Sequence, residues 1–349
     1  MTGTVYSERL GSIEDAQFDA ATRKAGLGGF VRAAPISTGL FGQNVFLTTT
    51  RGEFVFRGAP HWHRTGEAIA FTQDDAWQFP KEQLYARLLH EADEVPMAWP
   101  QVLDTSRETF PWPYLLMPRL PGLCLGNPAE RAGLKAADFV AVARALGEAL
   151  AGLQKLTRDA AGDFSSATQT IVPFEGGYGA HLAQEVRRHA GDARRNGRFD
   201  AEDDAFLEAL IAADARAGDA GPAVYIHNDF NLGNLLLERA GEGWRVSGVV
   251  DLMTSEFGDP AADFSRLICN WLDRDTPACA AALIAGYRGA GGVADPSPAR
   301  LDLLTGYERL MIWAYYTRPE VDHADMRGQT FRGFVARYLE RMRGHWFGA

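Results

Sequence analysis

The chain of 349 residues has little cysteine, no long apolar run and no excess of basic charge. Its three cysteines, Cys124, Cys269 and Cys279, are far apart and odd in number, which argues against a disulfide framework and favours a reducing compartment. No apolar run approaches the roughly 18 residues that cross a bilayer, and the first residues lack the basic and then apolar pattern of a secretory signal. We therefore expect a cytoplasmic protein with no membrane partner.

The charge balance limits the partners further. Lys and Arg number 35 and Asp and Glu number 45, so the formal net charge is −10. Proteins that coat nucleic acid carry the opposite excess, and we expect no nucleic-acid partner. Hydrophobic residues make up 46% and charged residues 23%, which is ordinary globular usage and argues against a largely disordered chain. At about 150 residues per domain, the length predicts two folding units.

The first third of the chain alternates between β and α patterns. Two β-rich runs, 45–49 and 53–57, are separated by a turn-competent stretch and predict a hairpin. Leucines at helical spacing predict a helix over 81–91. The short apolar run 114–117 predicts a strand that ends at the following proline.

From about residue 136 the pattern becomes helical and alanine-rich, and a polar helical stretch covers roughly 179–218. A compact β section follows, and the chain from Asp259 onward is mainly helical. The mixed β and α pattern of the first third thus gives way to a mainly helical one. We place the boundary ahead of this helical part, with one domain over 1–119 and the other over 120–349.

The most informative segment is YIHNDFNLGNLLL, residues 225–237. In it His227, Asp229 and Asn234 form the pattern H-x-D-x-x-x-x-N directly after an apolar strand. The next strand ends at Asp251, which we expect at the mouth of the same small sheet. Phosphoryl transfer needs a carboxylate that orients or deprotonates the attacking hydroxyl, and hard oxygen ligands that hold Mg²⁺ on the nucleotide phosphates. This spacing supplies both kinds of group.

With these residues, and with FGDPAADF at 257–264, the chain resembles the aminoglycoside phosphotransferase and choline-kinase-like enzymes, which are small-molecule kinases. The resemblance runs from about Ala33 to the C-terminal helices. It implies a two-lobed, protein-kinase-like α+β fold. A small β-rich N-lobe over 1–119 would bind the nucleotide, and a larger, mainly helical C-lobe over 120–349 would carry the catalytic loop and bind the substrate.

The resemblance also implies roles for the motif residues. Asp229 would be the catalytic base or the residue that orients the hydroxyl, and Asn234 and Asp251 would bind Mg²⁺. His227 would support the loop, and its place after an apolar strand agrees, because a histidine there is typically a hydrogen-bonded core residue.

Two further aspartates lie in the segment that follows. Asp259, followed by Pro260, suits the N-cap and first position of a helix, and Asp263 could brace the catalytic loop from the first turn. Plain helix capping is the alternative for both.

The N-lobe is expected to hold the nucleotide phosphates. Gly39, Gly42 and Asn44 lie before a strand, where the resemblance predicts a phosphate-covering loop; an ordinary hairpin turn is the alternative. Arg57 stands where kinases typically carry Lys, and it can grip phosphate oxygens with two donors. Glu82, in the predicted helix, is its expected partner; a solvated pair of side chains is the alternative.

The stretch 113–122 resembles the hinge between lobes, where the backbone between Met117 and Leu120 would bind the adenine edge. The expected cofactors are ATP, with GTP possible, and Mg²⁺. The connection 58–80 is longer than needed, and its His61 and His63 suggest zinc. Because no third ligand is evident, we favour a surface loop, or one that folds over nucleotide or substrate.

The accepting molecule is harder to predict. Trp313, Tyr315 and Tyr316 could line a pocket for a cation or a sugar face, although such spacing is also typical of a core. Asn231 and Leu232 stand where many relatives have His and Pro, which weakens assignment to a named subgroup.

We expect an ATP-dependent O-phosphotransferase, a monomer or homodimer, that acts on a hydroxyl of a small and cationic molecule of the aminoglycoside type, in antibiotic resistance. A kinase for choline, an amino alcohol or a sugar is the first alternative. A catalytically silent kinase-like binding protein is the second, and the intact Asp229, Asn234 and Asp251 argue against it. No D-F-G or A-P-E signature is present, which argues against a protein kinase.

Overall fold

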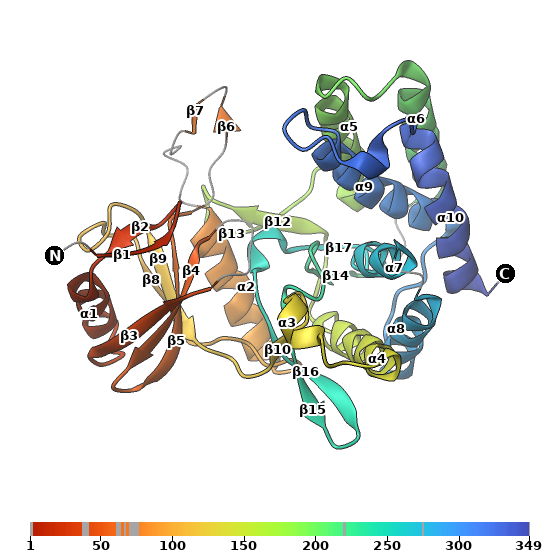
Figure 1. Cartoon of the computed structure of the whole chain (residues 1–349). Coiled ribbons are helices and arrows are strands. Elements are labelled where there is room, and N and C mark those ends of the chain that lie inside the picture. The colour runs from red at the N-terminus through yellow and green to blue at the C-terminus, as the bar shows by residue number, and fades with distance from the viewer. Residues whose placement is uncertain are drawn as a thin grey trace. The chain divides into compact units, whose positions relative to one another are not determined.

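The computed structural model describes residues 3–36, 42–60, 64–65, 68–69, 77–218, 221–273 and 276–348. The chain groups into two units, one of 1–134 with 164–170 and 232–255, and one of 135–163 with 171–231 and 256–349. The expected α+β class is confirmed, with a β-rich N-terminal region and a helical C-terminal region (Figure 1). The sequence predicted a single boundary after residue 119, whereas the contact-based units are discontinuous. The division into a nucleotide-binding lobe, 1–119, and a substrate-binding lobe, 120–349, describes function and stays a prediction.

An antiparallel sheet in the order β3–β4–β5–β9–β8 forms the centre of the first unit. Its strands are β3 (Phe30–Pro35), β4 (Asn44–Thr49), β5 (Gly52–Gly58), β9 (Tyr114–Pro118) and β8 (Val102–Asp104). The predicted hairpin is confirmed: Thr49 pairs with Gly52, which leaves a two-residue turn. Gly52 has a φ of 144°, a conformation that favours glycine. Further elements of this unit are β1 (Thr4–Ser7), β2 (Gly11–Ile13), α1 (Asp15–Lys24), β6 (Arg64–Thr65), β7 (Ala68–Ile69), α2 (Gln78–Ala92) and α3 (Pro128–Arg131).

Aromatic side chains fill the core on one face of this sheet. Phe18 of α1 packs edge-on against Phe56 of β5 with ring centroids 5.3 Å apart, and Phe56 contacts Phe110 at 5.1 Å. Aromatic pairs of this geometry add to the free energy of burial. The core therefore fixes β5, the strand that carries Arg57.

Two smaller groups of strands border the motif residues. In one, β15 (Leu235–Ala240) and β16 (Gly243–Val249) form a hairpin, and β10 (Leu123–Cys124) pairs with β15. In the other, the order is β11–β14–β17–β12–β13. Its strands are β11 (Thr157–Arg158), β14 (Ala223–Ile226), β17 (Glu256–Gly258), β12 (Gly162–Ser165) and β13 (Thr170–Pro173).

The expectation that the strands around the motif share one small sheet is wrong. Val224 of β14 pairs with Thr157 of β11 and with Gly258 of β17. Both hydrogen-bonding edges of β14 are therefore occupied, and β15 and β16 pair with each other and with β10 instead.

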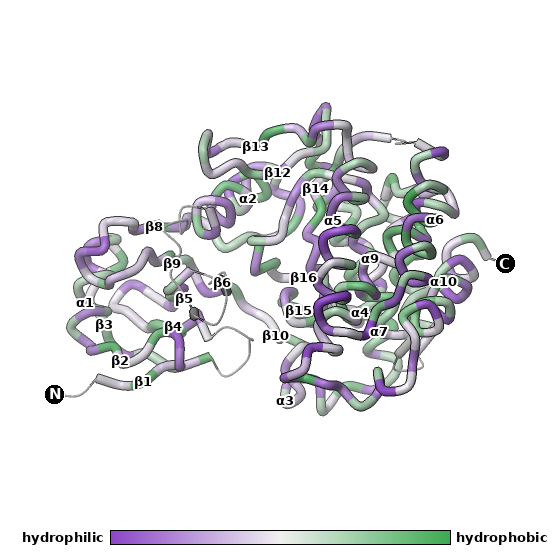
Figure 2. The backbone as a smooth tube through the Cα atoms, turned by 90° about the horizontal axis from the view of Figure 1, so that it is seen from above, coloured by the Kyte–Doolittle hydropathy of each residue, from purple (hydrophilic) through white to green (hydrophobic). Residues whose placement is uncertain are grey.

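Helices make up most of the second unit. They are α4 (Ala136–Leu153), α5 (Gly177–Arg195), α6 (Ala201–Ala217), α7 (Phe264–Asp273), α8 (Pro277–Gly289), α9 (Pro298–Tyr316) and α10 (Phe331–Phe347). The predicted polar stretch 179–218 is two helices, because Gly197 takes a φ of 73° and Asp200 caps a new helix, accepting from the backbone of Asp203 at 2.8 Å. Figure 2 shows hydrophilic residues along α5. Among the described helices, none is long and apolar enough to span a membrane.

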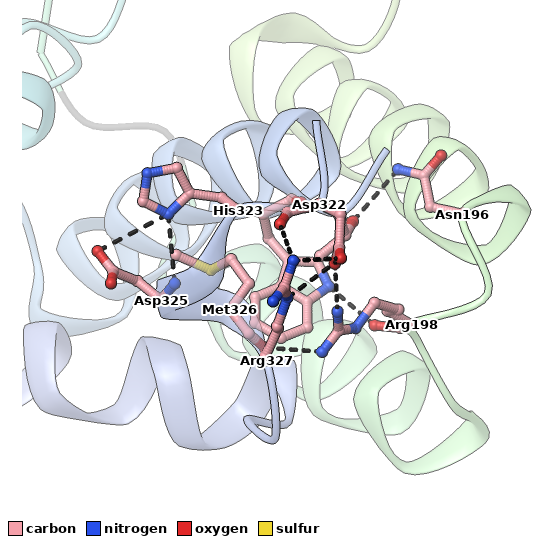
Figure 3. Close-up of polar contacts among 9 residues, drawn as sticks. Asn196, Arg198, Asp322, His323, Asp325, Met326 and Arg327 are labelled. Carbon is pink, nitrogen blue, oxygen red and sulfur yellow. Dashed lines mark hydrogen bonds and ion pairs between the residues drawn. The ribbon is translucent and has the colours of Figure 1, made fainter. Parts of the chain in front are cut away.

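The segment between α9 and α10 is fastened by polar contacts (Figure 3). Arg198 donates to the carboxylate of Asp322 at 3.2 Å and to the carbonyl of Met326 at 2.9 Å. Arg327 donates to the same carboxylate at 2.8 Å. Trp313 is fully buried, and its Nε1 donates to the carbonyl of Arg198 at 2.9 Å. Trp313 is therefore a core residue and does not line an acceptor pocket, whereas Tyr315 is exposed.

Helices α4 and α8 lie side by side (Figure 1), and glycines allow their close approach. A Cβ at Gly147 of α4 would collide with the carbonyl oxygen of Leu283 and lie 2.6 Å from the nitrogen of Tyr287. A Cβ at Gly286 of α8 would collide with the carbonyl oxygen of Arg144. The two helices can therefore approach this closely only because Gly147 and Gly286 have no side chain.

We predict that Gly147→Ala lowers the free energy of unfolding by about 1–3 kcal/mol through overpacking, although alanine favours helices by about 1 kcal/mol. Gly289→Ala is the matched control, because a Cβ there meets nothing within 4 Å, and we expect no loss. Urea unfolding measures both. Equal stability of the two variants would contradict the packing argument.

Candidate active site

A buried ionic cluster surrounds Arg57 in the first unit. Its Nη2 lies 3.0 Å from Oε1 of Glu82 and 2.7 Å from Oδ1 of Asp251, and its Nη1 lies 3.3 Å from Oδ1 of Asn44. The Arg57 side chain is 7% exposed. Burial by itself lowers the pKa of Arg57, but the carboxylates of Glu82 and Asp251 outweigh burial and raise the pKa of the guanidinium. Arg57 therefore stays charged at every ordinary pH.

The cluster is supported by neighbouring elements. Gln78, one turn before Glu82 on α2, donates to Oε1 of Glu82 at 3.1 Å. The Asn44 and Arg57 positions pair across β4 and β5. Within the described chain, the Nε of Arg57 is buried and has no hydrogen-bond partner. A buried donor of this kind is costly unless an acceptor reaches it, and a phosphate oxygen fits that need.

Asn234 and Asp251 flank the open end of the β15–β16 hairpin. The last paired residues are Leu235 and Val249, and the nitrogen of Val250 donates to the carbonyl of Asn234 at 3.0 Å. Asp251 takes a left-handed conformation, φ 64° and ψ 59°, and its side chain is 28% exposed. An amide oxygen and a carboxylate are the hard donors that Mg²⁺ takes when nucleotide phosphates and water complete its coordination.

Within the described part of the chain, no group of three or more His, Cys, Asp and Glu side chains is placed to hold a metal ion. Two protein ligands suit Mg²⁺ on a nucleotide, whereas a structural zinc site takes four. The histidines 61 and 63, with most of the connection 58–80, lie outside the described residues.

The other predicted nucleotide residues have local roles. Gly39 lies outside the described residues. Gly42 has a φ of 55°, its carbonyl accepts from the Ser7 hydroxyl at 2.5 Å, and a Cβ there would lie 2.8 Å from Cβ of Ser7. Met117 lies in β9 and pairs with Val55. Leu120 lies so close to Gly248 that a Cβ at Gly248 would collide with it.

The loop after β14 is braced in the second unit by Asp263. Its Oδ2 accepts from the nitrogen of His227 and its Oδ1 from the nitrogen of Asn228, each at 2.8 Å. His227 is fully buried, and its Nδ1 accepts from the nitrogen of Asp229 at 3.3 Å. Asn228 has a φ of 59°, so the chain turns sharply before Asp229. Asp263 and His227 thereby fix the backbone that presents Asp229.

The carboxylate of Asp229 contacts two side chains that were not predicted as site residues. Oδ1 accepts from Nδ2 of Asn231 at 2.8 Å and forms an ion pair with Nη1 of Arg266 on α7. Asp263 is the last residue of the turn before α7, and Arg266 follows it by three residues, in the first turn of the helix. This spacing is the signal in the sequence that could have identified Arg266 as a residue near the loop. A basic residue one turn after the brace reaches the same loop.

Asp259 holds the turn before α7. Its Oδ1 accepts from the nitrogen of Ala261 at 2.8 Å, and its Oδ2 pairs with Nη1 of Arg300 at 2.8 Å. Arg300 also pairs with Asp214 at 2.6 Å. We expected Asp259 to cap a helix that begins at Pro260, but residues 260–263 form a turn and α7 begins at Phe264. Asp259 caps this turn and also takes part in a buried ionic network with Arg300 and Asp214.

A cavity of about 20 Å³ lies beside the braced loop within the second unit. Its lining includes Asn228, Asp263, Arg266, Tyr307 and Glu308. It has room for about one water molecule.

Comparison with known proteins decides the family. A model of the phosphotransferase enzyme family matches residues 32–304. The chain belongs to this family. The predicted enzyme class, a kinase-type phosphotransferase, is thereby confirmed, as is the resemblance on which it was based.

Solved structures support the fold of this phosphotransferase. Macrolide 2'-phosphotransferase MphH from Brachybacterium faecium is 19% identical, with a TM-score of 0.57, over 93% of this chain and 98% of that chain. A thermostable mutant of aminoglycoside phosphotransferase APH(4)-Ia, with AMP-PNP and hygromycin B, is 15% identical, with a TM-score of 0.55, over 93% and 98%. Wild-type aminoglycoside 2'-phosphotransferase-IIIa with GDP is 14% identical, with a TM-score of 0.58, over 97% and 98%. No curated protein matches the chain.

The Arg57 cluster generates a stability prediction. Arg57→Ala leaves two carboxylates without their cation, and we expect a loss of about 3–5 kcal/mol in the free energy of unfolding. Arg57→Lys keeps the charge and should lose less. Arg51→Ala, an exposed arginine in the preceding turn, is the control and should change little. Urea unfolding measures the series, and a fully stable Arg57→Ala variant would refute the pairing.

Asp263 generates a pH prediction. Burial raises its pKa to about 6, although His227 and the two backbone amides favour the charged form. The folded state therefore binds the proton more tightly than the unfolded state, and the stabilisation falls as pH rises from about 4 through about 6. The wild type should lose about 2–3 kcal/mol relative to Asp263→Asn over this range.

Urea unfolding between pH 4 and pH 7 gives the two curves. Asp204→Asn, on the exposed face of α6, is the control and should run parallel to the wild type. Parallel curves for wild type and Asp263→Asn would show that Asp263 does not titrate in this window.

Proposed function

We propose that the chain transfers the γ-phosphoryl group of ATP to a hydroxyl of a small, cationic molecule of the aminoglycoside type. The observation that carries the proposal is the Arg57 cluster, in which a buried guanidinium with an unpartnered Nε joins Glu82 and Asp251. Such a group binds phosphate oxygens and at the same time fixes a carboxylate that can hold a metal ion.

On the nucleotide side, Arg57 would bind phosphate oxygens, with Glu82 holding its orientation. Asn234 and Asp251 would hold Mg²⁺, which when bound neutralises charge on the phosphates. Gly39, Gly42 and Asn44 would cover the phosphates, and the backbone from Met117 to Leu120 would bind the base. Neighbours bind AMP-PNP in one case and GDP in another, which supports a nucleotide and leaves both ATP and GTP as substrates to test.

On the acceptor side, Asp229 would orient the hydroxyl and take its proton. The loop that carries it is fixed by Asp263 and His227, so little conformational freedom is lost when the acceptor binds. His227 and Asp263 would therefore act through the loop, and Asp259 would act through the turn before α7 that carries Asp263.

The proposed cationic acceptor rests on acidic side chains around Tyr307 in α9. Burial, followed by the carboxylates of Glu185 and Glu256, raises the pKa of the Tyr307 hydroxyl. Glu308 is its chain neighbour and lies at the small cavity. Neighbouring structures hold hygromycin B or kanamycin, which are polyamines with hydroxyls. Each of these carboxylates has a basic partner in the same unit, Arg188 for Glu185, His181 for Glu256 and Arg266 for Glu308, so a cationic acceptor would exchange with these partners.

A coupled ADP-release screen with Mg·ATP and Mg·GTP tests the proposal. The acceptors are kanamycin, hygromycin B, a macrolide, choline and common sugars. Turnover with kanamycin or hygromycin B supports the proposal, whereas turnover with choline or a sugar alone identifies a metabolite kinase. Nucleotide binding without turnover on any acceptor identifies a silent binding protein and overturns the proposal.

We predict that Asp229→Asn lowers kcat by about 10²–10⁴-fold, because the amide cannot take the proton. Asp204→Asn, a remote surface variant of the same chemistry, should keep full activity. Steady-state ADP release on the accepted substrate measures both. Unchanged turnover in Asp229→Asn would remove Asp229 from the reaction.

A further inference from the structure

Glu256 on β17 differs from the other buried carboxylates of the described chain in the cation beside it. Its Oε2 lies 3.4 Å from Nε2 of His181 on α5, and an imidazole is charged only while it is protonated. Asp263 accepts from backbone nitrogens, and the remaining buried carboxylates pair with an arginine or a lysine. These are Glu82, Asp104, Asp203, Asp214, Asp302 and Glu308. The charge that balances Glu256 is therefore the one that can be lost near neutral pH.

An aromatic ring completes the surroundings of His181. The ring of Phe174, between β13 and α5, stacks on the imidazole with centroids 3.7 Å apart and an angle of 3° between the planes. Phe174 is half-buried, and the side chains of His181 and Glu256 are 22% and 11% exposed. A carboxylate at the edge of a cation and an aromatic face against it are features that bind an ammonium group. The imidazolium of His181 thus occupies a place that suits a cation.

Strand pairing places Glu256 near the loop that carries Asp229. Glu256 pairs with Ile226, the last residue of β14, and Asp229 follows Ile226 by three residues. Paired Cα atoms lie about 5 Å apart and three residues span at most about 11 Å, so the Cα atoms of Glu256 and Asp229 lie within about 16 Å of each other. The Glu256 carboxylate also acts on the hydroxyl of Tyr307, which lines the cavity beside this loop. An acceptor of two or three rings can therefore reach both carboxylates.

Several ionisable groups lie around His181 and the Glu256 carboxylate. Burial lowers the pKa of His181, but the carboxylates of Glu256, Glu185 and Asp163 outweigh burial and raise the pKa above its ordinary value of 6.5. His181 therefore keeps its proton at a pH where a solvated histidine has lost it. The groups are Glu185, Arg188 and Tyr178 on α5, Asp163 in β12, Tyr307 on α9 and Asp263 in the turn before α7.

We propose that His181 is a specificity-determining residue: it occupies a cation subsite made by Glu256 and Phe174, and an ammonium group of the acceptor replaces it there. The proposal rests on the proposed transfer to a cationic acceptor. The ammonium takes the place beside Glu256, the imidazole turns away from Phe174, and the displaced imidazolium gives its proton to water. The carboxylate thus has a cation before and after binding. A neutral sugar has no group that can replace the imidazolium, so the subsite favours amines.

The exchange gives acceptor binding a pH dependence of known sign. At low pH His181 is charged and competes with the acceptor for Glu256. As the pH rises through the raised pKa of His181, this competitor loses its charge. A variant without His181 should therefore bind the acceptor more tightly than the wild type at low pH, and the difference should disappear at high pH.

Isothermal titration calorimetry with kanamycin, or with hygromycin B if the wild type prefers it, tests the proposal at pH 6 and pH 9. Mg·AMP-PNP is present to prevent turnover. Each variant is compared with the wild type at the same pH, so the titration of the acceptor's own amines cancels from the ratio. His181→Gln should bind kanamycin about 3–10-fold more tightly than the wild type at pH 6, and the ratio should approach one at pH 9.

Two further variants separate the roles of the pair. Glu256→Gln should weaken kanamycin binding about tenfold, and in that background the gain from His181→Gln at pH 6 should largely disappear. His323→Gln is the matched control. It removes a histidine 3.7 Å from Asp325, a carboxylate that is exposed, and it should bind kanamycin like the wild type at both pH values.

Each outcome decides the proposal. Equal or weaker binding by His181→Gln at pH 6 would overturn it. If His181→Gln does not fold, His181→Lys keeps a permanent cation and should match the wild type at pH 6 but bind about 3–10-fold more weakly at pH 9; wild-type affinity at pH 9 would then overturn the proposal. Phosphorylation of kanamycin with no effect of His181 would overturn the subsite and leave the proposed function standing. A wild type that binds neither kanamycin nor hygromycin B would overturn both.

Discussion

A carboxylate that is withdrawn from water needs a cation or hydrogen-bond donors beside it, and the structure of this phosphotransferase is organised around that requirement. In the first unit, Arg57 meets it for Glu82 and Asp251. In the second unit, two backbone amides meet it for Asp263, and Arg266 contacts Asp229. The same contacts that make burial tolerable also fix the orientation of the groups that we propose for the reaction.

This arrangement links stability to chemistry. Because β5 is held by the aromatic core around Phe56, the guanidinium of Arg57 leaves the sheet at a fixed point. Because Asp263 binds successive backbone nitrogens of the loop, Asp229 is presented on a backbone that substrate binding need not order. A substitution that disturbs a partner should therefore affect folding and turnover together, whereas loss of a reacting oxygen should affect turnover alone.

The sequence predicted features that depend on residues close together in the chain. It did not predict contacts between segments that are far apart in the chain. The β4–β5 hairpin, the family and the position of Asp263 beside the loop follow from patterns of a few residues. The contact of Arg57 with Asp251 joins residues 194 apart, and no local pattern contains it. The shared sheet around the motif was wrong because β14 has both edges occupied by strands distant in sequence. Trp313 is core because its surroundings come from other helices.

The central claim is that the chain moves a phosphoryl group to a small-molecule hydroxyl, and the mass of the acceptor tests it most directly, since ADP release alone does not separate transfer from hydrolysis. Kanamycin or hygromycin B is incubated with Mg·ATP and the wild-type protein, and the mass of the product is measured by mass spectrometry. The account predicts an acceptor heavier by one phosphoryl group, formed with wild-type protein and not with Asp229→Asn. An acceptor of unchanged mass, across the whole panel of hydroxyl compounds and with nucleotide bound, would contradict it.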